Sequence, residues 1–235
     1  MSVFAIADLH LSFSTNKSMN IFKGWTDYVQ RLEVNWKNVI STDDTVVIPG
    51  DISWGMSLDE SLPDLQFLND LPGKKIMLKG NHDYWWNTQK KMKSFFIQHN
   101  LNTLSLVHNN AIVVENIAVC GTRGWLFDIE GNQDKKVLLR EVGRLRTSLD
   151  AAVKTSLEPV VFLHYPPVYE NNICNEIYQV LLDYKVKRCF YGHIHGYATQ
   201  KSFNGERDGI RFQLISCDYV NFCPVLIEKN ASIIK

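Results

Sequence analysis

The sequence predicts an α/β protein, because short apolar runs rich in β-branched residues alternate along the chain with longer amphipathic stretches. The expected strands are residues 3–7, 45–48, 75–78, 111–114, 118–120, 160–163, 187–191, 211–215 and 225–227. The expected helices are residues 26–40, 58–69, 88–100, 134–157 and 175–183. With 235 residues, of which 45% are hydrophobic, the chain can bury one sizeable core, so we expect a single domain over residues 1–235.

Local signals justify several of these elements. Ser57-Leu58-Asp59-Glu60 matches a capping box and starts the second helix, although Pro63 lacks a backbone N–H and makes a later start the alternative. Asn87 is the expected N-cap of the third helix. Gly143 costs a helix about 1 kcal/mol relative to alanine and predicts a bend or break in the fourth. A hairpin is expected around Glu115-Asn116.

Charge and composition exclude several classes of protein. The chain carries 25 basic and 25 acidic residues, whereas DNA-coating proteins have a strong basic excess, so we expect no stable nucleic-acid binding. We see no secretory signal, and no apolar run reaches the roughly 20 residues of a membrane span. The five cysteines form no CxxC pair, which favours reduced thiols and a cytoplasmic location. The oligomeric state is left open.

Polar clusters directly follow five of the expected strands. They are Asp8-Leu9-His10, Gly50-Asp51, Gly80-Asn81-His82-Asp83, His164 and Gly192-His193-Ile194-His195. Ligands of open α/β sheets bind beyond the carboxyl ends of the strands, so these clusters are expected to form one site. A glycine before a ligand residue allows a sharp turn and a close approach of the backbone.

Seven side chains of these clusters offer oxygen or nitrogen ligands to a metal. They are Asp8, His10, Asp51, Asn81, His164, His193 and His195. Seven ligands are too many for one divalent ion and suit two ions that share a carboxylate. The mixed N/O set without thiolate favours Mn, Fe or Zn. Alternate residues of an extended segment point to the same side, which would place His193 with His195 and Asp8 with His10.

The order of these motifs, from Asp8 to His195, resembles the calcineurin-like metallophosphoesterase superfamily. The resemblance implies a four-layer α/β/β/α sandwich of the metallo-dependent phosphatase type, with a two-metal centre between the sheets. The implied ligands are Asp8, His10 and His195 for the first ion and Asn81, His164 and His193 for the second, with Asp51 bridging both. The implied activity is hydrolysis of a small-molecule phosphomonoester or phosphodiester by a metal-bound hydroxide.

Further residues around the metals are candidates for roles in catalysis, and the resemblance itself implies that of His82. His82 would face the substrate and protonate the leaving oxygen, so His82 and Asp51 are the candidate catalytic residues. Arg123 follows another strand and is suited to bind a phosphate, with a structural ion pair as the alternative. Arg123 and Asn81 are the candidate substrate contacts. Asp83 either supports His82 or caps its loop.

One motif departs from the phosphoprotein phosphatase branch of the superfamily, which continues as Gly-Asp-x-x-Asp-Arg-Gly. Here Trp54 stands at the position of the second aspartate and no arginine follows. This departure favours a small-molecule substrate over a phosphoprotein. Aromatic residues crowd the same loops: Phe13, Trp54, Tyr84, Trp85, Trp86, Trp125 and Tyr165. They are expected to form one of three things: a stacking platform for a nucleoside, part of the core or a dimer contact.

Three alternatives stay open: a non-catalytic metal-binding scaffold of the same fold, a nuclease and a lipid pyrophosphatase. A scaffold should have lost ligands or His82, and all are present. A nuclease would favour a basic groove or an added DNA-binding domain. A lipid pyrophosphatase would use an exposed basic amphipathic helix, for which residues 88–100 are the candidate, although their apolar side chains suit a core equally well.

Overall fold

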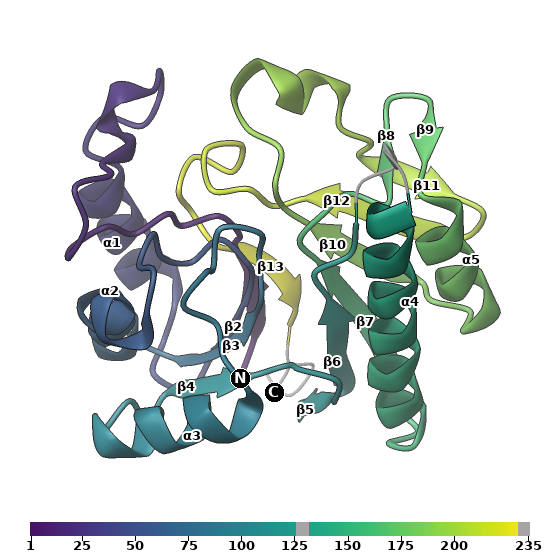
Figure 1. The fold of residues 1–235 in the computed structure, drawn as a ribbon, viewed down its shortest axis with the longest axis horizontal. Helices are drawn as coiled ribbons and strands as arrows, with labels where there is room; N and C mark the ends of the chain where they lie inside the picture. The colour runs from purple at the N-terminus through teal and green to yellow at the C-terminus, as the bar shows by residue number, and fades with distance from the viewer. Residues whose placement is uncertain (126–131, 230–235) are drawn as a thin grey trace, which may run out of the picture.

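Two β-sheets face each other, and helices cover the outer face of each (Figure 1). The computed structural model describes residues 1–125 and 132–229. The first sheet, ordered β13-β1-β2-β3-β4, contains β1 (Val3–Ala5), β2 (Thr45–Pro49), β3 (Lys74–Leu78), β4 (Leu104–Leu106) and β13 (Val225–Glu228). The second, ordered β11-β12-β10-β7-β6-β5, contains β5 (Ile112–Val114), β6 (Ile117–Thr122), β7 (Glu158–Leu163), β10 (Arg188–Tyr191), β11 (Gly205–Arg207) and β12 (Ile210–Leu214).

Five α-helices in the described residues form the outer layers (Figure 1). Those beside the first sheet are α1 (Tyr28–Val39), α2 (Leu58–Asp70) and α3 (Gln89–Gln98). Those beside the second sheet are α4 (Asn132–Val153) and α5 (Asn175–Asp183). Short 3-10 helices η1 (Met19–Ile21) and η2 (Gly196–Lys201) and a small hairpin of β8 (Val168–Tyr169) and β9 (Asn172–Ile173) complete the chain. The predicted four-layer α/β/β/α sandwich is confirmed.

The apolar residues of the strands explain these layers. In β2, Val46 and Ile48 pack toward the helices of the first sheet, whereas Val47 packs between the sheets. In β7, Val161 packs toward the helices of the second sheet, whereas Phe162 packs between the sheets. Successive side chains of a strand point to opposite faces, so a continuous apolar run fits a strand that is covered on both sides.

The helix ends follow the sequence signals in part. Ser57 caps α2 by accepting the Glu60 N–H at 3.2 Å, and the helix continues through Pro63, so the later start is wrong. Helix α3 is capped by Thr88 and not by Asn87, which lies one residue outside it. The fourth helix was expected to bend or break at Gly143. It does not break, since α4 runs continuously from Asn132 to Val153.

Short elements were the hardest to predict. Strands β4, β8, β9 and β11 have only two or three residues each, too few for an alternating pattern, and they form by pairing with a neighbour. The first strand ends at Ala5, two residues earlier than expected. The expected hairpin is confirmed, because β5 and β6 pair antiparallel with Val114 opposite Ile117.

Helix α3 does not provide the membrane-binding face that a lipid pyrophosphatase would use. Phe95 and Phe96 are buried in the core beside the first sheet, and only Ile97 of the expected apolar residues is exposed. Among the residues that the structure describes, no helix combines the length and the apolar character needed to cross a bilayer.

The parallel strands bring the polar clusters to one end of the sandwich. Strands β1, β2 and β3 run parallel in one sheet, and β7, β10 and β12 run parallel in the other. A bridge between Ala7 and Ser216 joins the two sheets at their carboxyl ends. The loops after β1, β2, β3, β7 and β10 therefore meet where the two sheets come together.

Candidate metal centre

Two groups of side chains that are able to hold a metal ion lie at the carboxyl ends of the strands. Asp8, His10 and His195 form one group, and Asp51, His164 and His193 form the other. Within each group the ligand atoms lie within 4.8 Å of one another. Asn81 adjoins the second group, since its Oδ1 lies 2.6 Å from His164 Nε2. All seven side chains singled out in the sequence therefore converge.

Asp51 lies between the two groups. Its Oδ2 is 3.8 Å from His10 Nε2 and 3.4 Å from His164 Nε2. The other oxygen, Oδ1, accepts the backbone N–H of His82 at 2.8 Å. One carboxylate thus faces both groups and also holds the start of the His82 loop, which is the geometry that a bridging ligand requires.

Hydrogen bonds at Nδ1 of two histidines direct the other ring nitrogen, Nε2, toward the candidate ligands. His164 Nδ1 lies 3.2 Å from the Pro49 carbonyl, and His195 Nδ1 lies 2.8 Å from Asp218 Oδ1. A proton on each Nδ1 leaves Nε2 as the ligand atom. His195 Nε2 is buried without any hydrogen-bond partner and lies 3.9 Å from Asp8 Oδ1. An unpaired buried nitrogen beside a carboxylate is what a metal ion would satisfy.

Asp218 is a functional candidate that the sequence analysis missed. Its carboxylate holds His195 through Oδ1 and accepts the Gly196 N–H at 2.8 Å through Oδ2. The signal that would have found it was present, since Asp218 follows the expected strand at residues 211–215 just as the other clusters follow theirs. It was overlooked because it belongs to none of the five motifs.

Replacing Asp218 with alanine is expected to weaken divalent-metal binding by about 10- to 100-fold, because His195 loses the carboxylate that orients its ring. Asp218→Asn retains an acceptor for His195 Nδ1 and should lose less. Titration of metal-free protein with Mn²⁺ against a competing chelator measures the effect, with the exposed Asp43→Ala as control. Unchanged affinity in Asp218→Ala would contradict this positioning role.

The backbone at the site differs from the expected extended geometry. Asp8, His10, Asp51 and His193 have positive φ angles of 62°, 47°, 50° and 73°. Asp8 and His10 lie in one group as expected, whereas the pairing of His193 with His195 was wrong, because these two residues enter different groups. The extended geometry assumed for both pairs is replaced by left-handed turns beyond the strands. Such conformations cost roughly 1–3 kcal/mol each and concentrate at functional sites.

Two glycines allow these turns to approach one another, as the sequence predicted. A Cβ on Gly50, whose φ is +95°, would lie 2.6 Å from the Gly80 Cα and 2.7 Å from His164 Nδ1. A Cβ on Gly80 would collide with Asp51. Only glycine brings the loops after β2 and β3 and the His164 ring this close.

Of the two roles considered for Asp83, the structure shows loop capping. Its buried carboxylate accepts the N–H groups of Gly80, Asp51 and Ile52 at 2.7–2.9 Å and the Trp85 indole N–H at 3.0 Å. A weaker bond at 3.3 Å comes from the Ser53 N–H. Asp83 therefore ties the loop after β2 to the loop after β3.

Burial sets the protonation of the site. It raises the pKa of Asp8 to about 7, with the charge of Asp51 adding to the rise, and it also raises the pKa of Asp51. It lowers the pKa of His164 to about 3 and, with help from neighbouring imidazoles, that of His193 to about 2. The imidazoles of His164 and His193 are therefore neutral and can bind a metal, while the buried carboxylates lack a full counter-charge. Two divalent cations would supply that charge.

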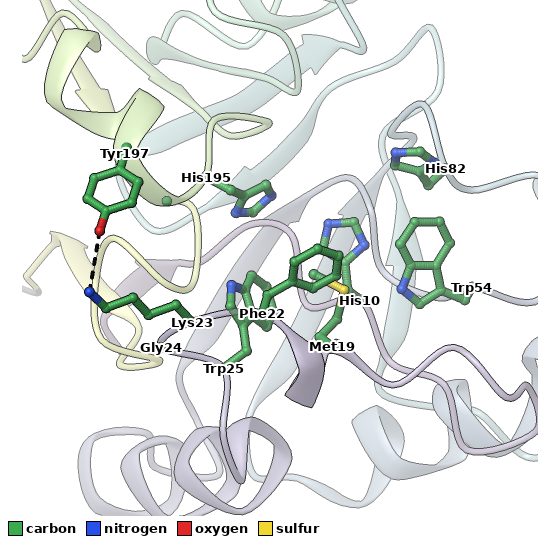
Figure 2. Close-up of a pocket in the computed structure, with 11 residues that line it drawn as sticks. His10, Met19, Phe22, Lys23, Gly24, Trp25, Trp54, His82, His195 and Tyr197 are labelled. Atoms are coloured by element: carbon green, nitrogen blue, oxygen red, sulfur yellow. Dashed lines mark hydrogen bonds between the residues drawn. The ribbon is translucent and has the colours of Figure 1, made fainter.

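A cavity of about 680 Å³ opens beside the first group, where His10 and His195 line it, and His82 lies at one end of it (Figure 2). The His82 ring is not part of either ligand group, and its centroid is 4.5 Å from that of Trp54. Among the described residues, no carboxylate hydrogen-bonds to the His82 ring. Trp54 thus places an aromatic ring where the phosphoprotein phosphatase motif has an aspartate.

Comparison with known proteins agrees with this geometry. The sequence model of the calcineurin-like phosphoesterases matches residues 1–197. The chain belongs to the calcineurin-like phosphoesterase family. Members of this family are metal-dependent hydrolases that act on phosphoesters and bind divalent metals in a binuclear centre, and the two ligand groups of this chain are able to hold such metals.

Individual relatives of the phosphoesterase are distant. The Gene 66 protein of Mycobacterium phage L5 is 35% identical over 81 residues, which span 33% of this chain and only 37% of the phage protein. The phosphopantetheinyl hydrolase of Mycobacterium tuberculosis has a TM-score of 0.58 at 15% identity and covers 100% of this chain and 98% of its own. A Thermus thermophilus protein has a TM-score of 0.58 at 9% identity, over 96% of this chain and 97% of its own. At these identities the two structures show a shared fold.

Arg123 lies at the end of β6 in the phosphoesterase, outside the residues that line the cavity. Its guanidinium is 3.6 Å from Glu141 Oε1 and 4.9 Å from the centre of the Trp125 ring. Its carbonyl accepts the N–H groups of His164 and Tyr165 at 3.1 Å and 2.8 Å. The ion pair that the sequence left as the alternative is formed, and the phosphate contact stays a prediction.

The aromatic residues near the centre of the phosphoesterase do not form one platform. Trp85 and Trp86 are buried in the core beside the first sheet, and Phe13 packs against Phe67. Trp125 and Tyr165 pack against each other with centroids 5.8 Å apart. Of the seven aromatic residues singled out in the sequence, Trp54 alone lines the cavity beside His82.

Proposed function

We propose that the protein hydrolyses a small-molecule phosphomonoester or phosphodiester at a centre of two divalent ions, Mn, Fe or Zn. The first ion is assigned to Asp8, His10 and His195 and the second to Asn81, His164 and His193, with Asp51 shared. The observation that carries the proposal is the position of the Asp51 carboxylate, within 4 Å of a histidine of each group. When bound, such ions activate water and neutralise charge on the phosphoryl oxygens.

His82 is assigned as the general acid. As the oxygen of water bonds to phosphorus and releases one proton to solvent, the bond from phosphorus to the leaving oxygen breaks and its electron pair moves to that oxygen. The His82 ring then delivers the proton that the leaving oxygen needs. The bond from its backbone N–H to Asp51 and the contact of its ring with Trp54 support this role, because they hold the ring beside the ligand groups.

Asn81 and Arg123 are assigned to the substrate. The Asn81 side chain adjoins His164 through Oδ1, so its amide nitrogen is a candidate donor to a phosphoryl oxygen. Arg123 is supported by its place on the loop that holds His164. Its bond to Glu141 would have to be exchanged for one to phosphate.

Metal affinity is expected to fall as the pH falls through about 7, because protons on Asp8 and His195 compete with the ion. Burial lowers the pKa of His195, but the hydrogen bond to Asp218 and the charge of Asp8 outweigh burial and raise it above its ordinary value. The raised pKa of Asp8, about 7, means that an ion must displace a proton there at lower pH. His164 and His193 stay neutral, since their pKa values are about 3 and about 2. Affinity should therefore drop by about tenfold per pH unit for each displaced proton.

Calorimetric titration with Mn²⁺ checks this pH dependence. Measurements in two buffers of different ionisation enthalpy count the protons released on binding. Affinity that stays constant between about pH 8 and about pH 5, with no proton released, would contradict both the burial of Asp8 and its place among the ligands.

Metal replacement tests the proposed function. The protein is stripped of metal, restored with Mn²⁺, Zn²⁺ or Fe²⁺ singly, and assayed with p-nitrophenyl phosphate and bis-p-nitrophenyl phosphate. We expect turnover of at least one ester with at least one metal and none in the stripped protein. A folded protein that binds these metals and hydrolyses neither ester would be a non-catalytic scaffold.

A further inference from the structure

The cavity beside the metal centre is lined mainly by apolar side chains (Figure 2). Its volume, about 680 Å³, lies within the range of small-molecule sites, which is roughly 300–1,000 Å³. Met19, Phe22 and Trp25 come from the segment between β1 and α1, and Trp54 comes from the loop after β2. Two candidate metal ligands, His10 and His195, also line it. The cavity is therefore continuous with the metal centre, but its surface is mainly apolar whereas the metal centre is polar.

The two ends of the cavity differ in character. His82 and Trp54 lie at one end, and Lys23 and Tyr197 lie at the other, joined by a hydrogen bond (Figure 2). A general acid must reach the leaving oxygen, so the leaving group lies on the side of the phosphoryl group that His82 faces. His82 lines the cavity, so a leaving group that His82 reaches lies in the cavity. The step rests on the proposed function, because it takes His82 as the acid.

The apolar walls favour a flat apolar occupant. Phe22 is 53% exposed although it lines the cavity, whereas Trp25, which also lines it, is 2% exposed. Covering the exposed apolar surface of Phe22 is favourable because it removes that surface from water. The rings of Phe22, Trp25 and Trp54 provide the faces and edges against which an aromatic ring packs.

Lys23 supplies charge at the far end. Its Nζ lies 3.3 Å from Tyr197 Oη and 5.7 Å from the centre of that ring. Within residues 1–125 and 132–229, no carboxylate forms an ion pair with Lys23. The ammonium group is thus held at the end of the cavity without a counter-charge, which suits an anionic ligand group.

We propose that this cavity binds the leaving group of the substrate, an aromatic body that carries an anionic group at the end remote from phosphorus. The aromatic body packs against Phe22 and Trp54, and the anionic group pairs with Lys23. The oxygen that leaves phosphorus lies beside His82.

Binding of product-like probes to the metal-free protein tests the cavity without catalysis. The probes are 6-hydroxy-2-naphthoate, which carries a carboxylate, and neutral 2-naphthol, measured by calorimetry and by quenching of tryptophan fluorescence. The wild type should bind both, the naphthoate about fivefold more tightly because of Lys23. Lys23→Met should remove this preference, and Phe22→Ala should weaken both probes about tenfold.

Matched controls separate the cavity from general effects. Ile21→Ala removes an apolar side chain that is 83% exposed, next to Phe22 but outside the cavity. Lys37→Met removes a lysine that pairs with Glu33 on α1. Both variants should bind the probes as the wild type does. Equal binding of the two probes by the wild type would overturn the role of Lys23.

The results distinguish failure of this inference from failure of the proposed function. An enzyme that hydrolyses p-nitrophenyl phosphate but binds neither probe overturns the leaving-group cavity alone. A protein that binds the probes but hydrolyses no ester with any metal overturns the proposed function and, with it, the assignment of the occupant as a leaving group. If both hold, 2-naphthyl phosphate should have a lower KM than phenyl phosphate, and Phe22→Ala should abolish the difference.

Discussion

Replacing His82 with alanine is expected to lower the turnover of an alkyl phosphoester by about 10²- to 10⁴-fold while metal content stays unchanged. The loss follows from the absence of a proton donor for a poor leaving group. Metal content is retained because the His82 ring belongs to neither ligand group. Its backbone N–H, which bonds to Asp51, is also kept by alanine.

The leaving group separates this role from a structural one. The p-nitrophenolate ion leaves with little need of a proton, so His82→Ala should lose much less activity with p-nitrophenyl phosphate than with the alkyl ester. His99→Ala, which removes a histidine that packs on Phe95 away from the centre, is the matched control. Metal analysis of each variant completes the test. Equal losses with both esters, or loss of the metals, would refute the assignment.

Replacing Asp83 with alanine is expected to lower the free energy of unfolding by roughly 3–5 kcal/mol. The variant leaves four backbone N–H groups and the Trp85 indole N–H buried without the acceptor that they share. Each buried donor without a partner costs about 1–3 kcal/mol, partly offset because the loops relax. The cost falls on the two loops that carry Asp51 and Asn81.

Urea denaturation of the metal-free protein measures this effect, with Asp43→Ala as the control because Asp43 is exposed. Metal affinity should fall in Asp83→Ala as well, since the two loops lose their common attachment. A change in unfolding free energy below about 1 kcal/mol would show that water satisfies these donors and that Asp83 does not hold the loops together.

The positions of the chemistry-bearing residues could be predicted because each follows a strand. Runs of three or four apolar residues identify β2, β3, β7 and β10, and parallel strands bring their carboxyl ends to a common edge. Asp51 and His164 were therefore expected to meet although more than 100 residues separate them. The N-cap at Ser57 and the hairpin before Ile117 were equally local signals, each contained in a few neighbouring residues.

Other features depend on contacts that no local pattern contains. Asp218 orients His195, Asp83 ties two loops together, and Lys23 meets Tyr197 across 174 residues of sequence. Each contact exists because the complete sandwich positions two loops against each other. The apolar cavity is likewise formed by loops from separate strands. Hydrophobic periodicity and turn residues thus specified the helices and strands and the order of the metal ligands along the chain. The pairing of side chains between distant loops required the packing of both sheets.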